Sequence, residues 1–80
     1  MTEPIRITHA GDADVQKIWR LAALDDRRAP RVPALLAYVG DELRAAVGLV
    51  DGQAVADPFH PTADIVEMLR FQARHEEVAA

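Results

Sequence analysis

Residues 35–59, LLAYVGDELRAAVGLVDGQAVADPF, decide the fold of this chain, because they hold two tight-turn signals between apolar runs. Gly40-Asp41 and Asp51-Gly52 are dipeptides that accept the positive φ angles of two-residue hairpin turns. The apolar runs around them therefore predict three antiparallel strands, at about residues 34–39, 42–50 and 53–57.

The two turns also predict how the strands pair. If Val39 faces Glu42 and Val50 faces Gln53, one face of the sheet is apolar without interruption. Its members are Leu36, Tyr38, Leu43, Ala45, Val47, Leu49, Ala54 and Ala56. The opposite face mixes apolar and polar side chains and is too apolar to be fully solvated.

A strand and a helix precede this meander. Residues 5–8, IRIT, alternate apolar and polar side chains and predict a short strand. Residues 11–26, GDADVQKIWRLAALDD, predict a helix that starts at Gly11 or Asp12. Helical spacing places Val15, Ile18, Trp19 and Ala22 on one face, so we expect Trp19 in the core. Pro30 and Pro33 then make residues 27–33 a connector.

A second helix follows the meander, beginning at Pro61 or Thr62. Ile65, Val66, Leu69 and Ala73 form its apolar stripe, whereas Met68 and Phe71 lie beside the stripe. The tail is expected to fray over about residues 76–80. The order β-α-β-β-β-α predicts one α+β domain over residues 1–80, with two helices and a four-stranded, largely antiparallel sheet.

The composition limits the possible classes of function. The chain has 80 residues, no cysteine and a net charge of −4. Without cysteine there is no disulfide or thiolate zinc site, so self-association is the available way to stabilise so small a core. A net acidic domain is not expected to bind nucleic acid. No leader-like or membrane-spanning run occurs, so we expect a cytoplasmic protein. Its expected partner is a second copy of the chain or another bacterial protein.

Residues 4–70 resemble the first half of an N-acetyltransferase of the GNAT family. The residues that carry the resemblance are the opening IRITHAGDADVQKIWRLAALDD and the meander with its Val–Gly–acid turn. The resemblance implies a half-GNAT-like fold. The resemblance also implies a glycine-rich loop before the following helix, which in that family binds the pyrophosphate of acetyl-CoA.

That loop is replaced in this chain. Aligning Pro58 with the family proline puts Pro61 at the family arginine, and Thr62, Asp64 and Val66 at the three glycines. Proline has no N–H to donate, side chains keep a phosphate away from the backbone, and Asp64 repels an anion. We therefore predict no catalytic residue and no cofactor, with His60, Thr62, Ala63 and Asp64 as the candidate region if acetyl-CoA does bind.

The other candidate residues have simpler interpretations. His9, His60 and His75 are too scattered to predict a metal site. His60 is expected to be a loop histidine that helps to cap the helix. Arg27, Arg28 and Arg31 are expected to complement the end of the first helix and to pair with nearby aspartates, with contact to a protein or phosphate as the alternative.

Two hypotheses for function follow. The first is a non-catalytic domain that self-associates or binds another protein through an open strand edge at residues 53–57. Its interface candidates are Gln53, Val55, Asp57, Met68 and Phe71. The alternative is an acyl-CoA-binding protein, or a minimal acetyltransferase, whose cleft is completed by dimerisation.

Overall fold

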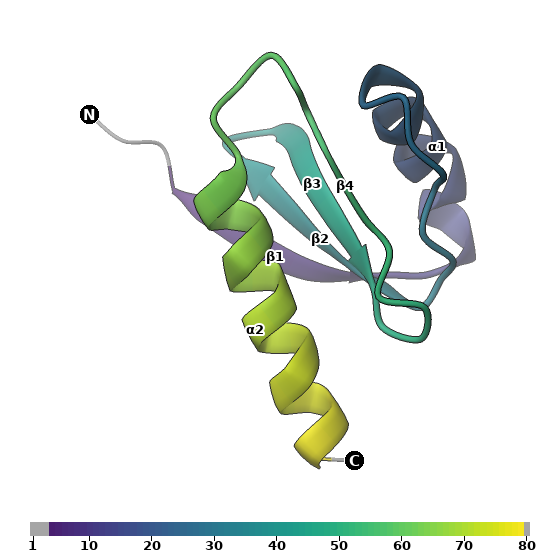
Figure 1. Ribbon diagram of the computed structural model, residues 1–80, viewed down its shortest axis with the longest axis vertical. Helices are drawn as coiled ribbons and strands as arrows, with labels where there is room; N and C mark the ends of the chain where they lie inside the picture. Colours follow the sequence, from purple (N-terminus) through teal and green to yellow (C-terminus); the bar gives the residue numbers. More distant parts are fainter. Residues whose placement is uncertain (1–3, 80) are drawn as a thin grey trace.

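A four-stranded antiparallel sheet lies between two helices in the computed structural model, which describes residues 4–79 (Figure 1). The sheet order is β1-β2-β3-β4, which is also the order along the chain. The strands are β1 (Ile5–Ala10), β2 (Ala34–Val39), β3 (Glu42–Gly48) and β4 (Ala54–Ala56). The helices are α1 (Val15–Leu24) and α2 (Ala63–Ala79). The predicted α+β class and order of elements are confirmed.

The first helix packs close to the sheet through a narrow stripe. A 3₁₀ turn (Asp12–Asp14) leads into α1, and the Asp14 carboxylate accepts the Gly11 N–H at 3.2 Å. Ile18, Leu21 and Ala22 are the buried residues of α1. They pack on a sheet face built largely from alanines, which are Ala10, Ala34 and Ala46, together with Leu36 and Val55.

The expectation that Trp19 lies in the core is wrong, because its side chain is 66% exposed. Ile18, Leu21 and Ala22 make the contact between α1 and the sheet, and Trp19 does not belong to that cluster. Trp19 therefore lies on the flank of α1, beside the connector that follows the helix.

An extra residue in β3 interrupts its pairing with β2. Tyr38 pairs with Leu43 as predicted, but Ala37 pairs with Ala45, so the residue between them, Arg44, forms a β-bulge. Side chains beyond the bulge lie on the opposite face from the one predicted. The single apolar face is therefore wrong: Leu36, Tyr38 and Leu43 lie on the α1 side, and Ala45, Val47, Leu49, Ala54 and Ala56 lie on the α2 side.

The second hairpin has a longer loop than predicted. Val47 pairs with Ala54, and the Gly48 N–H donates to Gln53 O at 2.9 Å, so the strands separate before Val50. Gly52 has the expected positive φ of 67°. The Asp51 carboxylate accepts the N–H groups of Gln53 and Arg31, which ties this loop to the connector. These bonds favour the four-residue loop over a two-residue turn.

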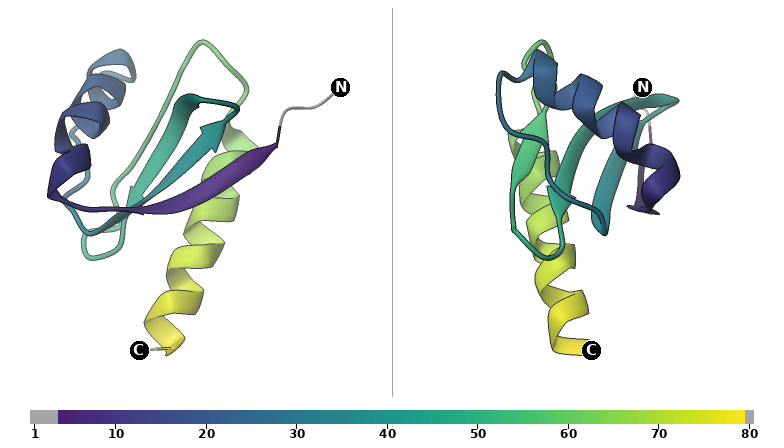
Figure 2. Two further views of the ribbon diagram at one scale, coloured as in Figure 1. Left: turned by 180° about the vertical axis from the view of Figure 1, so that it is seen from behind. Right: turned by 90° about the vertical axis from the view of Figure 1, so that its right-hand side faces the viewer.

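The second helix covers the other face of the sheet (Figure 2). Ile65 and Leu69 are buried against Leu35, Ala37, Ala45 and Val47, with Val66 and Ala73 packed beside them, which confirms the predicted stripe. The Val66 N–H donates to Thr62 O, so Thr62 caps the helix. Helical backbone reaches Ala79, within the segment where we expected fraying.

The two edges of the sheet differ. β4 has only three residues, and the Ala56 N–H, which points away from β3, donates to Asp25 Oδ2 at 3.1 Å. Gln53 Nε2 also donates to Arg28 O in the connector at 2.9 Å. The open edge that we expected at residues 53–57 is therefore closed by the end of α1 and the connector. β1 has six residues, and no other strand within residues 4–79 pairs with its outer edge.

Candidate functional site

A buried carboxylate marks the point where β4 leads into α2. Asp57 directly follows β4, and its N–H donates to Arg44 O at 2.8 Å. The β-bulge places the Arg44 side chain on the α2 side of the sheet, within reach of this carboxylate. Asp57 is the one polar residue among the buried positions of the described chain.

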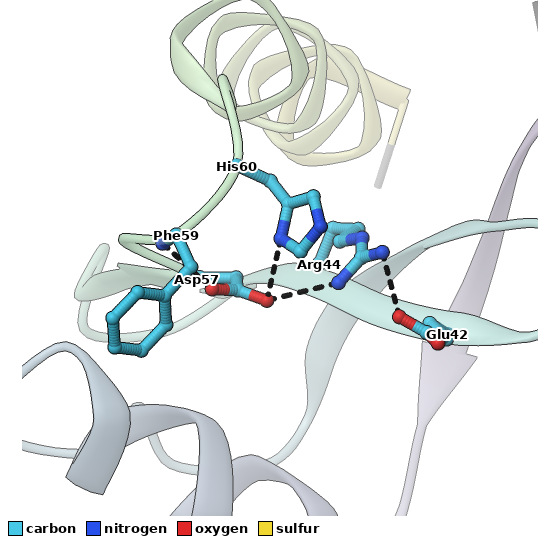
Figure 3. A network of polar contacts seen from close by, with 5 residues as sticks. All are labelled: Glu42, Arg44, Asp57, Phe59 and His60. Carbon is cyan, nitrogen blue, oxygen red and sulfur yellow. Dashed lines mark hydrogen bonds and ion pairs between the residues drawn. The ribbon is translucent and has the colours of Figure 1, made fainter.

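Three groups hold the Asp57 carboxylate (Figure 3). Oδ1 accepts the Phe59 N–H at 2.8 Å, and Oδ2 accepts Arg44 Nη1 at 2.9 Å. His60 Nδ1 lies 3.1 Å from Oδ2, and since an ionised carboxylate only accepts, that nitrogen carries the hydrogen. The hydrogen bond from the Phe59 N–H is the main reason that the pKa of Asp57 lies below its ordinary value, and it outweighs the opposing effect of burial.

A hollow of about 500 Å³ opens beside this network. His60, Thr62 and Asp64 line it together with Arg44, over an apolar floor of Ile5, Val39 and Ile65. Ala63, the first residue of α2, is exposed and does not line it. Three of the four residues of the candidate region are thus brought together at this hollow.

Arg44, the arginine that lines the hollow, is already paired with two carboxylates. Arg44 donates to Asp57 and also lies 2.6 Å from Glu42 Oε2 through Nη2. The Asp64 carboxylate adds negative charge at the start of the helix, and Pro61 lacks the N–H that an anion would need. The geometry therefore suits a structural network that fixes the β4–α2 junction better than an anion-binding site.

Sequence reasoning missed the role of Arg44. Arg44 is the one basic residue of β3, and the strand is apolar beyond it, so a charged partner is expected nearby. Asp57 is the one acid that directly follows the adjacent strand. The predicted two-residue turn concealed this pairing. With Val50 facing Gln53, Arg44 would lie opposite Phe59, whereas the observed register of β3 and β4 places it opposite Asp57.

The interface candidates lie in different environments. Val55 and Asp57 are buried, so their side chains do not lie at the surface, and Gln53 is bonded to the connector. Met68 and Phe71 are exposed on α2 and, with Ile7 of β1, are the apolar residues of a hollow that is otherwise lined by polar and charged side chains, which are Asp64, Glu67, Arg70, Gln72 and Arg74. The apolar surface among these candidates therefore lies beside β1 and not beside β4.

The arginine-rich connector forms one wall of a groove against α1. Trp19, Val15 and Ala22 line the helix side, and Arg27, Arg28 and Arg31 lie on the connector side. Arg27 Nε lies 3.4 Å from Asp25, which agrees with the local ion pairing expected there. Burial opposes ionisation of Asp51, but the Gln53 and Arg31 N–H groups and nearby Arg28 hold its pKa below its ordinary value.

The three histidines have separate local contacts. His9 Nε2 bonds to Glu76, His60 contacts Asp57, and His75 Nδ1 lies 3.1 Å from Phe71 O. In the part of the chain that the structure describes, no three histidine, aspartate or glutamate side chains gather to hold a metal ion. Neither helix, over its described residues, has the length and apolarity to cross a membrane.

Comparison of the chain with protein-family models, with curated proteins and with solved structures found no match.

Proposed function

We propose that this chain is a non-catalytic, GNAT-like domain that acts by self-association. The observation that carries the proposal is the contrast between the two sheet edges. β1 presents a six-residue outer edge, whereas β4 is short and capped by Asp25. An uncovered edge offers N–H and C=O groups to another strand.

Exposed apolar side chains beside β1 support the proposal that self-association takes place at this edge. Ile5, Met68 and Phe71 are large apolar residues that are exposed, and Ile7 lies next to the two α2 residues. Apolar side chains beside an unpaired edge are what a pairing surface requires, because the edge supplies hydrogen bonds and the side chains supply area removed from water. A second copy of the chain is an occupant that presents the same edge and the same side chains.

Self-association predicts a dimer in solution. Size-exclusion chromatography with light scattering at micromolar concentration is expected to give twice the mass of one chain. Phe71→Asp is expected to give the mass of a single chain, because it places a charge on the apolar surface. The matched control is Phe59→Asp, since Phe59 is 76% exposed in the β4–α2 loop and is expected to leave the dimer intact. A monomeric wild-type chain would contradict the proposal.

The alternative, acyl-CoA binding, receives less support from the β4–α2 junction. Arg44 is occupied by Asp57 and Glu42, and Asp64, which the resemblance aligns with a glycine of the pyrophosphate loop, adds negative charge at the hollow. Millimolar coenzyme A is therefore expected to leave the melting temperature unchanged in a thermal-shift measurement. A rise of several degrees that is lost in His60→Ala would favour acyl-CoA binding instead.

A further inference from the structure

The backbone groups along β1 alternate between the two sides of the strand. Pro4 O accepts the Gly40 N–H, and β1 pairs with β2 in regular register from Ile5–Val39 to Ala10–Ala34. Hydrogen-bonded pairs alternate along an antiparallel ladder, so Arg6 and Thr8 bond to β2. The N–H and C=O groups of Ile5, Ile7 and His9 therefore point to the outer edge.

This alternation allows only a few ways to pair two β1 strands about a two-fold axis. Outward groups must meet outward groups, and two or more outward residues of each described strand are paired only when the axis passes beside residue 6, 7 or 8 of both copies. An axis at residue 6 places Arg6 opposite the partner copy's Arg6, and like charges directly opposite each other are unfavourable. An axis at residue 8 leaves Ile5 without an opposite residue in the partner's strand.

An axis at Ile7 avoids both costs. Ile5 then faces His9 of the second copy, Ile7 faces its own equivalent, and Arg6 faces Thr8. All three outward residues of each strand are hydrogen-bonded. This is the register in which the described strand pairs over its greatest length.

The side chains on the α2 side fit the same axis. Ile5, Ile7 and His9 alternate with Arg6 and Thr8, and Ile7 packs in the cluster beneath α2. Because α2 packs on β2 and β3, two copies would hold their helices about 14 Å apart or more, at 4.7–4.9 Å per strand. Helices pack directly at about 8–10 Å, so a furrow would remain between them. The paired isoleucines form its floor, and Met68 and Phe71 of both copies are long enough to line its walls.

From these observations we infer that two copies join their β1 strands, antiparallel, about a two-fold axis at Ile7 to form a continuous eight-stranded sheet. This inference rests on the proposed self-association and adds its partner surface and register. The partner is a second copy of this chain, and both α2 helices lie on the same side of the joined sheet.

Single cysteines test this register, because the chain has none of its own. Facing residues in an antiparallel pair have Cα atoms about 4.5–5.5 Å apart, which a disulfide spans, whereas diagonal neighbours at about 7–8 Å are too far apart. Under mild oxidation, Ile7→Cys is expected to form a disulfide-linked dimer. Arg6→Cys and Thr8→Cys alone are expected to give little, but an equal mixture of the two is expected to cross-link. Val50→Cys, at the exposed tip of the second hairpin, is the control for random collision and is expected to stay unlinked.

Each other outcome has a defined meaning. Self-linking of Arg6→Cys or Thr8→Cys in place of Ile7→Cys overturns the register. Absence of linking at all three positions, in a protein that still has twice the chain mass by light scattering, overturns the β1 surface and leaves self-association standing. A monomer overturns both. If Ile7→Cys fails to fold, the mixture of Arg6→Cys and Thr8→Cys tests the same axis.

Discussion

Replacing Asp57 with alanine is expected to lower the free energy of unfolding by about 3–5 kcal/mol. The change removes the acceptor of the Phe59 N–H and leaves Arg44 without the buried carboxylate that it bonds. Both donors lie in a partly buried site, so water does not fully replace the lost bonds. Urea denaturation at a fixed protein concentration, followed by circular dichroism, measures the effect.

Glu42→Ala is the matched control, because Glu42 pairs with the same guanidinium but is exposed. Its expected cost is at most about 1 kcal/mol. The pH dependence provides a second check. Because the folded-state pKa of Asp57 is lowered, its contribution is present above the unfolded-state pKa and is lost as the pH falls through the folded-state pKa. Asp57→Asn is expected to lack this part of the acid destabilisation, and equal costs for Asp57→Ala and Glu42→Ala would contradict the role given to the network.

Leu35→Ala and Leu36→Ala are each expected to cost about 2–5 kcal/mol of stability. These neighbours point to opposite faces of β2, and both are buried, Leu35 under α2 and Leu36 under α1. A sheet covered on one side only would give a large cost at one leucine and a small cost at the other. Thermal or urea unfolding of the two variants therefore tests whether both helices pack on the sheet.

Leu24→Ala is the control, because it makes the same leucine-to-alanine change at an exposed position. Leu24 is the last residue of α1, and its side chain is 53% exposed. Its removal is expected to cost less than about 1 kcal/mol, since little area returns to water. A cost at Leu24 equal to that at Leu36 would show that burial does not determine the ranking.

Much of the fold is predictable from the sequence because its signals are local. Gly40 takes the positive φ that the first turn requires, and Val39 faces Glu42 as the turn predicts. The apolar stripe of α2 can be recognised in the sequence because only one face of this helix packs on the sheet. The register beyond Tyr38 was not predictable in this way. Since both faces of the sheet are covered by helices, either register buries apolar side chains, and the pattern alone cannot favour the bulge.

The contacts of the candidate site were also hard to predict from the sequence, because they depend on strand register and on residues far apart in the chain. The residues around His60 do gather at one hollow, because they are close in the chain. The contact between Arg44 and Asp57 depends on the register of the second hairpin, and the closure of β4 depends on Asp25, which lies 31 residues from Ala56. Trp19 was misplaced because helical spacing identifies an apolar face but does not show which members of that face the sheet covers.

In the proposed dimer, the Asp25 carboxylate would also limit how large the assembly can grow. A protomer with two available edges could add neighbours at both ends and extend into a filament of indefinite length. With the Ala56 N–H occupied by Asp25, growth through β4 would be hindered, and the proposed assembly joined at β1 would end at two chains. One acidic side chain at the end of a helix would thus separate a dimer from a polymer.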